Sequence, residues 1–284
     1  MRRRRFLRAL LFGAVAILAG LLIWWALRPE PPAPTAPANG FDPADFVKAR
    51  PRLDAPYVVT GNDVVSAMLA IAAVRPNERV VDLGSGDGRI LIAAARSQGA
   101  RGLGVDIDPA RIRESTANAR AAGVSHRVIF RREDLFQTPL GDADVLTLYL
   151  SNDINFRLRP RILAQMRPGA RVVSHDFNMG DWRADQTQRV GASTVYLWIV
   201  PARVDGRWAM NVGGQNATLI IGQRYQQFTG AVTVNDQSTR IEQGRINATE
   251  LRFIVRINGQ RRVFEGRVEG DRIIGPNWRA TRIG

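Results

Sequence analysis

The spacing of apolar and polar residues divides the chain into four segments. Residues 9–27 are 19 uncharged, mostly apolar positions, enough at about 1.5 Å per residue to cross a hydrocarbon core. Residues 28–40 hold five prolines in 13 positions, which predicts a stiff spacer. We therefore expect a basic N-terminus with a transmembrane anchor over 1–27, a Pro-rich linker over 28–44, an α/β domain over 45–202 and an antiparallel β domain over 203–284.

The third segment alternates strands and helices. Asn62 is expected to cap a helix over 63–74, in which Val64, Met68 and Ile71 recur at helical spacing. The other elements are predicted as strands over 79–83, 102–107, 127–133, 143–150, 171–177 and 194–202, and helices over 88–97, 109–122 and, as a short one, 160–167. Such alternation predicts a Rossmann-like, mostly parallel sheet with ligands beyond the carboxyl ends of its strands.

The fourth segment has short alternating stretches separated by turn signals such as Gly213-Gly214 and Asn235-Asp236. This pattern predicts an antiparallel meander that curls into a small barrel or half-barrel, similar to a reduced lipocalin. The segment holds 13 arginines against seven acidic residues. Three roles stay open for it, namely binding substrate, a partner or a membrane surface; the alternative is a structural appendage with a solvated arginine face.

The N-terminal apolar run follows five arginines, Arg2 to Arg5 and Arg8. The positive-inside rule then holds the N-terminus in the cytoplasm and favours a single-pass inner-membrane protein whose remainder is periplasmic. Trp24 and Trp25 near the end of the run suit the headgroup layer. A cleaved export signal is the alternative, because Arg3 to Leu7 resembles a twin-arginine signal and Ala36 to Ala38 resembles a cleavage site.

Composition narrows the chemistry further. The chain has no cysteine and two histidines, so disulfides and thiolate chemistry are excluded and no metal site is expected. The formal charge is +14, but Lys48 is the only lysine and the arginines are spread along the chain, which suggests coding bias. No basic run interleaved with aromatic residues appears beyond the N-terminus, so no nucleic-acid partner is expected.

The strongest signature is VVDLGSGDGRI at 80–90, where a strand meets a glycine-rich turn and a helix. A dinucleotide fingerprint is Gly-x-Gly-x-x-Gly and must accept a pyrophosphate, whereas this turn is Gly-x-Gly-x-Gly with Asp82 before it and Asp87 inside it. Carboxylates there would repel phosphate, which weakens the alternative of a nicotinamide-dependent oxidoreductase. They suit a ligand that carries an ammonium and a sulfonium, as S-adenosylmethionine does.

At this point the chain resembles the class I S-adenosylmethionine-dependent methyltransferases, with GVDIDP at 104–109 and REDLF at 132–136 similar to that family's second and third motifs. The resemblance implies a seven-stranded sheet in which Asp106 holds the ribose hydroxyls, Asp134 accepts from the adenine amino group and Leu135 packs near the ring. The implied cofactor residues are Asp82, Gly84, Ser85, Gly86, Asp87, Gly88, Asp106, Ile107, Asp134 and Leu135. Asp108 is expected to cap the following helix instead.

Catalytic candidates follow the fourth and fifth strands: Tyr149, Asn152 and His175. This part resembles a branch that includes small membrane-associated protein-lysine methyltransferases, which implies a methyl acceptor in protein near the membrane. Ser151 and Asn152 depart from the Tyr-Leu-Leu-Pro expected in that branch, and this leaves the acceptor open. For His175 the alternative is a hydrogen-bonded residue that steadies the strand end. Pro56, Tyr57 and Thr60 precede the first helix, where the family often closes over the cofactor; the alternative is that they are ordinary loop residues.

Two functions therefore stay open. The first is transfer of a methyl group from S-adenosylmethionine to a nucleophile, with a protein lysine as the implied class. The second is a non-catalytic S-adenosylmethionine-binding envelope module whose β domain binds a ligand or partner.

Overall fold

The computed structural model describes residues 58–257 and 260–283. Among these, no helix is both long and apolar enough to cross a bilayer. The predicted anchor and Pro-rich linker lie outside the described residues, so both stay predictions.

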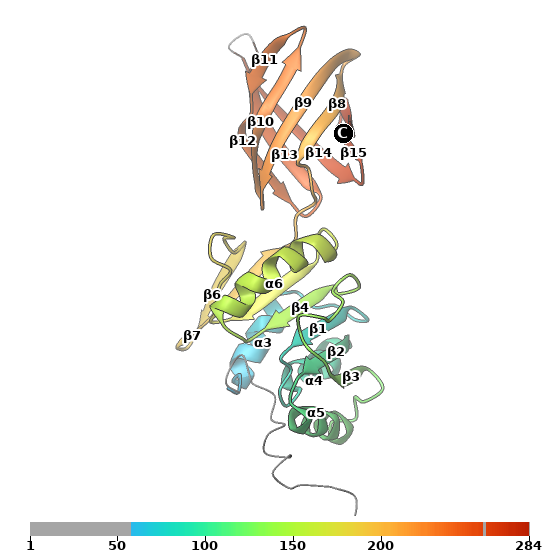
Figure 1. The fold of residues 1–284 in the computed structure, drawn as a ribbon, viewed down its shortest axis with the longest axis vertical. Helices are drawn as coiled ribbons and strands as arrows, with labels where there is room; N and C mark the ends of the chain where they lie inside the picture. Colours follow the sequence, from blue (N-terminus) through green and yellow to red (C-terminus); the bar gives the residue numbers. More distant parts are fainter. Residues whose placement is uncertain (1–57, 258–259, 284) are drawn as a thin grey trace, which may run out of the picture. The chain divides into compact units, whose positions relative to one another are not determined.

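The first of two sheets has seven strands in the order β3-β2-β1-β4-β5-β7-β6 (Figure 1). Strands β1 to β5 are parallel, and β7 runs antiparallel to both β5 and β6. The strands are β1 (Arg79–Leu83), β2 (Arg101–Asp106), β3 (Val128–Arg132), β4 (Val145–Leu148), β5 (Arg171–His175), β6 (Gln186–Val190) and β7 (Ser193–Ile199). The predicted Rossmann-like, mostly parallel sheet of seven strands is confirmed.

Within the described residues, four helices cover this sheet: α3 (Asn62–Ile71), α4 (Arg89–Gln98), α5 (Pro109–Ala121) and α6 (Asn152–Gln165). Val80 packs with α3 and α4 in one hydrophobic cluster, whereas its neighbour Val81 packs with α6 in a second. Successive strand residues point to opposite faces, so these clusters fill the two sides of the sheet. The connections from β1 to α4, from β2 to α5 and from β4 to α6 lie at the carboxyl edge of the sheet, and these connections contain the candidate motifs.

Two predicted elements were wrong in detail. Helix α6 begins at Asn152, not near residue 160, because Ser151 caps it by accepting a 3.3 Å hydrogen bond from the Ile154 amide. Pro160 inside the helix hid it from the pattern, although Ile154, Leu158 and Ile162 bury one continuous face. Asn62 does not cap α3, since it is the first helical residue and Gly61 occupies the cap position without a side-chain bond.

The second sheet is an antiparallel barrel, as predicted (Figure 1). Its order is β11-β10-β12-β13-β14-β15-β16-β8-β9, and pairing of β10 with β9 closes the ring. Strands β11 and β12 both pair with β10 and follow each other with Ile241 between them. The strands are β8 (Gly206–Val212), β9 (Gln215–Arg224), β10 (Gln227–Val234), β11 (Gln237–Arg240), β12 (Glu242–Asn247), β13 (Glu250–Ile257), β14 (Gln260–Glu269), β15 (Arg272–Ile274) and β16 (Trp278–Arg282).

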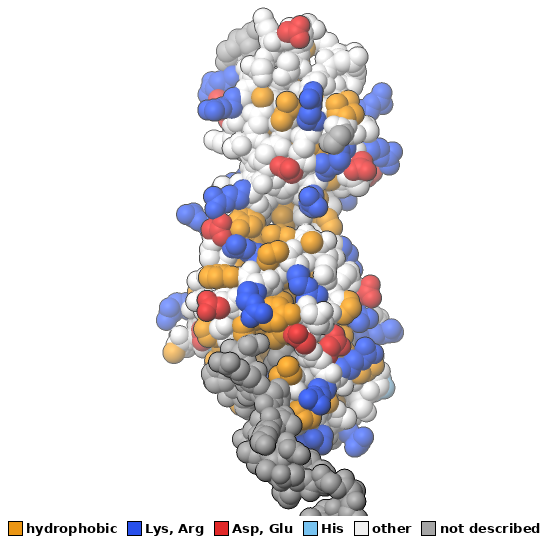
Figure 2. All heavy atoms as spheres, viewed as in Figure 1, with side chains coloured by type: hydrophobic (Ala, Val, Ile, Leu, Met, Phe, Trp, Pro, Cys, Tyr) orange, Lys and Arg blue, Asp and Glu red, His pale blue; other side chains and the backbone are white. Residues whose placement is uncertain are grey.

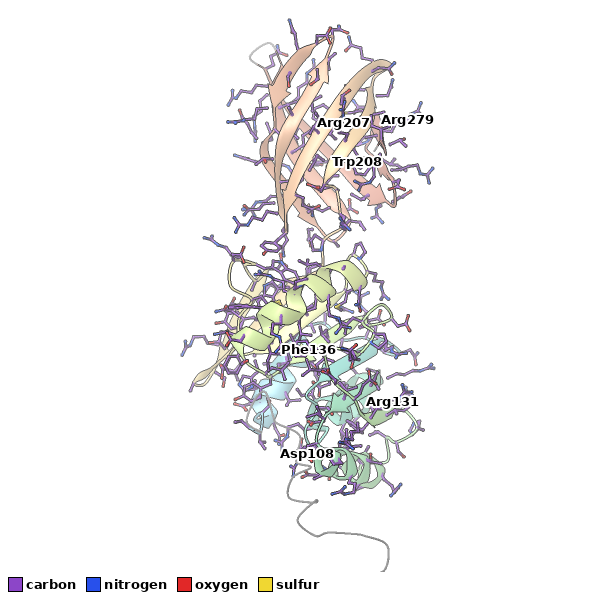
Figure 3. The ribbon with its side chains drawn as sticks, in the orientation of Figure 1. Asp108, Arg131, Phe136, Arg207, Trp208 and Arg279 are labelled. Atoms are coloured by element: carbon purple, nitrogen blue, oxygen red, sulfur yellow. The ribbon has the colours of Figure 1, made fainter. Side chains whose placement is uncertain are left out.

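The barrel interior is filled by large side chains. Phe253 and Phe264 stack with their ring centroids 5.0 Å apart, and Trp278 meets both rings edge-on. Trp208 is fully buried and donates its indole N–H to the Val204 carbonyl (Figure 3). Small barrels are packed in this way, whereas ligand-carrying barrels keep a cavity. Large rings therefore fill the barrel interior at these positions, and the likeness to a reduced lipocalin stays a prediction.

Candidate functional site

The turn between β1 and α4 forms the floor of a pocket at the carboxyl edge of the first sheet. Gly84 and Gly88 have φ of +76° and +82°, and a Cβ at Gly88 would lie 2.5 Å from the Phe130 ring. Glycine is therefore required at Gly88 on both conformational and steric grounds. The Gly84 and Ser85 amides both donate to the Val105 carbonyl at 2.9 Å, which holds the turn against β2.

Asp106, at the end of β2, is fixed by two backbone amides. One carboxylate oxygen accepts from Gly86 at 3.0 Å and the other from Asp108 at 2.9 Å. Each oxygen keeps a lone pair for a ligand hydroxyl, because a carboxylate accepts about four hydrogen bonds. Asp108 caps α5 by accepting from the Ala110 amide at 2.7 Å, as predicted.

Asp82 lies deeper, 2% exposed, and accepts a 2.7 Å hydrogen bond from the Thr147 hydroxyl. Burial raises the pKa of Asp82 to about 7, the Thr147 bond opposes this rise, and the charges of Asp106 and Asp87 add to it. Ionisation of the Asp82 carboxyl therefore costs free energy in this pocket, and a cation bound nearby would lower this cost. Thr147 is opposite Asp82 in the β1–β4 register and was not singled out from the sequence.

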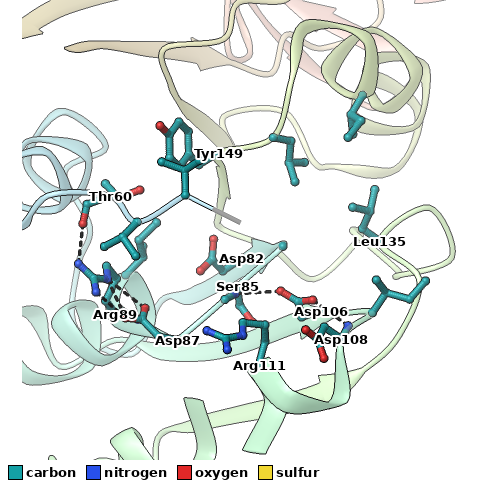
Figure 4. A pocket seen from close by; sticks show the side chains of 18 of the residues that line it. Thr60, Asp82, Ser85, Asp87, Arg89, Asp106, Asp108, Arg111, Leu135 and Tyr149 are labelled. Atoms are coloured by element: carbon teal, nitrogen blue, oxygen red, sulfur yellow. Dashed lines mark hydrogen bonds and ion pairs between the residues drawn. The ribbon is translucent and has the colours of Figure 1, made fainter. Parts of the chain in front are cut away.

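Asp87 has a different environment from the one its place in the signature suggests. Its carboxylate accepts 3.0 Å hydrogen bonds from the Arg89 side chain, and Arg89 also donates to the Thr60 carbonyl at 2.8 Å (Figure 4). Burial disfavours the anion, but the bonds from Arg89 outweigh it and hold the pKa of Asp87 below its ordinary value. Asp87 therefore fixes the Arg89 side chain, which in turn holds Thr60 in the segment before α3. The negative charge of Asp87 is paired within the chain.

The remaining walls come from the ends of β2, β3 and β4. Ile107 and Leu135 contribute apolar surface, and Asp134 accepts a 2.8 Å hydrogen bond from the Phe136 amide with one carboxylate oxygen. Tyr149 follows β4 and faces the same hollow (Figure 4). Apolar walls with a few directed polar groups are typical of a site for a small organic molecule.

Tyr149 is supported from behind by His175. The two rings stack with centroids 3.9 Å apart, and the imidazole contacts the Thr60 hydroxyl at 3.3 Å and the Ser193 hydroxyl at 2.8 Å. His175 is 3% exposed, and burial lowers its pKa against the opposing charge of Asp176. Burial and Asp176 also raise the pKa of Tyr149, so its phenol is neutral at neutral pH.

The structure brings most of the predicted residues into one pocket. Its lining includes Asp82, Gly84, Ser85, Gly86, Asp87, Asp106, Ile107, Asp134, Leu135 and Tyr149. Three predicted residues, Gly88, Asn152 and His175, do not line it. Asn152 accepts from the Asn178 amide at 3.1 Å and so fastens the loop after β5. Sequence reasoning did not assign Arg89, Arg111, Glu133 and Ile154, which do line the pocket.

These residues fit the cofactor that the motifs imply. The Ser85 hydroxyl is buried in the pocket and has no hydrogen-bond partner among the described residues. Buried hydroxyls normally make a hydrogen bond, so this one is suited to a polar group of a ligand. If the cofactor binds as the motifs imply, Asp106 would accept hydrogen bonds from the ribose hydroxyls and Asp82 would lie near a cationic group. Leu135 and Ile107 can flank an adenine ring.

Comparisons with known proteins agree with this geometry. Residues 82–186 match the family model described as the ANTKMT methyltransferase domain. A protein-lysine N-methyltransferase from Saccharolobus islandicus (strain REY15A) is 38% identical over 150 residues, which are 51% of this chain and 93% of that protein. An adenine nucleotide translocase lysine N-methyltransferase from Mus musculus is 30% identical over 168 residues, 59% of this chain and 68% of that protein.

Among solved structures, one described as an RNA methyltransferase from Salinibacter ruber in complex with S-adenosyl-L-homocysteine is 47% identical. It superposes with a TM-score of 0.51 and covers 52% of this chain and 96% of its own. The similarities therefore span about half of this chain.

Proposed function

Because this chain belongs to the class I S-adenosylmethionine-dependent methyltransferases, in the family of the ANTKMT methyltransferase domain, we propose that it methylates the side-chain amine of a protein lysine. The chain is an enzyme with S-adenosylmethionine as its cofactor, so the interpretation as a non-catalytic binding module is set aside. The names of two similar proteins support lysine as the acceptor.

The observation that best supports lysine as the acceptor is the charge of the residues that line the pocket. In a chain of formal charge +14, two arginines line this pocket against the six acidic residues Asp82, Asp87, Asp106, Asp108, Glu133 and Asp134. A site lined mainly by one sign of charge concentrates ligands of the opposite sign. Such a pocket favours a cationic lysine side chain over an anionic nucleic-acid strand.

S-adenosylmethionine supplies a methyl group already activated by its sulfonium, so the chain's residues mainly position the acceptor. The lysine loses a proton to solvent, its nitrogen forms the new N–C bond, the S–C bond breaks and S-adenosylhomocysteine leaves. Tyr149 lines the pocket, and its neutral phenol can accept a hydrogen bond from the amine and orient the lone pair of the amine nitrogen. His175 acts through Tyr149, since its ring lies behind the phenol and its nitrogens contact Thr60 and Ser193.

RNA is the second candidate acceptor, because the similar Salinibacter ruber structure is described as an RNA methyltransferase. The acidic pocket disfavours it. The Asp/Asn-Pro-Pro-aromatic motif of enzymes that methylate amino groups of nucleic acids is also absent from the sequence.

One labelling experiment separates the two acceptors. Purified full-length protein is incubated with methyl-labelled S-adenosylmethionine and either membrane proteins or total RNA, and the products are hydrolysed to amino acids or nucleosides. We expect label in methyllysine, and none with the Asp106→Ala variant. Label in nucleosides alone, or in neither fraction, would refute lysine methylation.

We also propose that residues 9–27 attach the enzyme to the inner membrane with the N-terminus in the cytoplasm. The uninterrupted apolar run and the preceding arginines support this, and the positive-inside rule favours a periplasmic catalytic domain. Protease digestion of a C-terminal tag in intact spheroplasts tests the orientation: a periplasmic domain loses the tag, and a cytoplasmic one keeps it. Intact mass of the mature protein tests the rival, cleavage after Ala38.

A further inference from the structure

Helix α6 buries one polar side chain among apolar ones. Asn155 is 0% exposed, and the other buried side chains of the helix are Ile154, Leu158 and Ile162. The side-chain oxygen of Asn155, Oδ1, is buried and has no hydrogen-bond partner among the described residues. Burying an amide oxygen without a partner costs free energy, which an apolar side chain would avoid. Packing of α6 against the sheet therefore does not explain an asparagine at this position.

The nitrogen of the same amide joins the two sides of a bend in the chain. Asn155 Nδ2 donates to the Ser174 hydroxyl at 3.2 Å and to the Phe177 carbonyl at 3.0 Å. Ser174 and Phe177 flank the dipeptide His175-Asp176. Asp176 has a φ of +57°, a left-handed conformation that is uncommon for residues other than glycine and that surrounding contacts must fix. Asn155 therefore holds this bend from both sides.

Two further residues of α6 hold the segment that follows the bend. Asn152 accepts a hydrogen bond from the Asn178 amide at 3.1 Å, and Arg159 donates to the Met179 carbonyl at 2.8 Å. Asn152, Asn155 and Arg159 follow the i, i+3, i+7 spacing that places side chains on one side of a helix. These three residues are here called the α6 clamp.

The bend carries the rings that support Tyr149. His175 stacks on Tyr149 with the ring centroids 3.9 Å apart, and the Phe177 ring centroid lies 5.9 Å from that of Tyr149. Tyr149 lines the pocket, but none of the three residues of the α6 clamp does. The α6 clamp therefore acts on Tyr149 through the bend.

We propose that Asn155 is a positioning residue for methyl transfer: by fixing the bend at His175-Asp176, it sets the place of the Tyr149 ring and so the direction of the acceptor amine. This inference rests on the lysine methylation proposed above, in which the Tyr149 phenol accepts a hydrogen bond from the amine. Transfer requires the amine nitrogen to be aligned with the methyl carbon, and a misplacement of about 1 Å can lower the rate by about a hundredfold.

The surface of the molecule does not mark another element that would orient the acceptor. Figure 2 shows basic side chains spread over the visible face and not gathered at one place. Charge on that face therefore does not single out a docking place, and the orientation of the amine depends on the walls of the pocket.

The two histidines of the chain allow the position of Tyr149 to be measured without any acceptor. The stack places the His175 ring protons in the ring current of the phenol, whereas His126 is exposed and serves as an internal reference. Imidazole resonances of the full-length protein are recorded by NMR for wild type, Asn155→Leu and Tyr149→Leu, the last of which defines the size of the ring-current shift. We expect Asn155→Leu to move the His175 resonances toward those of Tyr149→Leu and to leave His126 unchanged.

Kinetics test whether this geometry matters for transfer. With methyl-labelled S-adenosylmethionine and membrane proteins, Asn155→Leu should lower the rate of methyllysine formation by about tenfold to about a hundredfold. Calorimetry should show that its cofactor affinity stays within about twofold. Asn155→Ser, whose side chain is too short to join Ser174 to Phe177, makes the same comparison if leucine prevents folding.

Ile162→Val is the matched control, because Ile162 belongs to the same buried face of α6 and the substitution removes one methylene. It should leave both the His175 resonances and the rate unchanged.

The inference and the proposed function fail in different ways. No methyllysine with the wild-type protein would refute lysine methylation and, with it, the inference. Unchanged His175 resonances in a folded Asn155→Leu variant, or methyllysine formed by it at the wild-type rate, would overturn the inference alone. A loss of cofactor affinity as large as the loss of rate would also overturn it and assign Asn155 a general structural role.

Discussion

Replacing Asp82 by asparagine should stabilise the fold at alkaline pH while removing affinity for the cofactor. Asp82 is buried, and its pKa in the folded chain is about 7, against an ordinary value near 3.9. The folded chain therefore binds more protons than the unfolded chain between these values, so stability falls as pH rises from about 4 to about 7. Asparagine does not ionise, so the Asp82→Asn variant should not lose stability over this pH range.

The magnitude follows from the pKa difference. About three pKa units correspond to roughly 4 kcal/mol, which is the upper limit of stabilisation expected for Asp82→Asn at pH 8. At pH 5 the difference should shrink to about 1.5 kcal/mol, because the wild-type carboxyl is then protonated when folded. The asparagine oxygen can keep the 2.7 Å hydrogen bond from Thr147, so packing changes little.

Native-state hydrogen exchange of the β1 and β4 amides measures the free energy of opening of this sheet separately from the barrel. The measurement compares wild type and Asp82→Asn at pH 5 and pH 8. Asp134→Asn is the matched control, because Asp134 lines the same pocket but is exposed. A stability difference for Asp82→Asn that is independent of pH would refute the reasoning, as would destabilisation at pH 8.

Three further variants test other parts of the site. Gly88→Ala combines φ of +82° with a 2.5 Å clash against Phe130, so we expect a loss of at least about 2 kcal/mol in chemical denaturation. Asp108→Ala removes the cap bond to Ala110 and should cost about 1 kcal/mol in the same assay, with the β domain unaffected. Tyr149→Phe should lower kcat while leaving cofactor affinity within about twofold, which steady-state kinetics and calorimetry together establish.

The centre of the sheet was predictable because β1, β4 and β5 are mainly buried, apolar strands. The β1 turn, Asp106 and Asp134 each follow a strand directly, so parallel topology alone brings them to one edge. The cap at Asp108 was visible for the same reason, since a short acidic residue precedes a proline and a helix. These predictions depended only on residues that are close together in the sequence.

Contacts between distant segments could not be predicted in this way. The position of Asp87 in the signature predicts a charge for the ligand, whereas in the structure Arg89 binds the Asp87 carboxylate and also donates to the Thr60 carbonyl. The support of Tyr149 by His175 depends on the fifth strand, and Ser193 joins it from β7. Strand β6 was missed because Gln186–Val190 is polar and mostly exposed, and only its pairing with β7 defines it.

Equilibrium binding of S-adenosylmethionine to the purified protein tests the central claim, that the pocket at the carboxyl edge of the first sheet holds the methyl donor. In isothermal titration calorimetry we expect saturable binding at one site per chain, and no detectable binding for Asp106→Ala, which retains its backbone amides but lacks the carboxylate that Gly86 and Asp108 orient. Unchanged affinity in Asp106→Ala, with the variant folded by circular dichroism, would contradict this assignment.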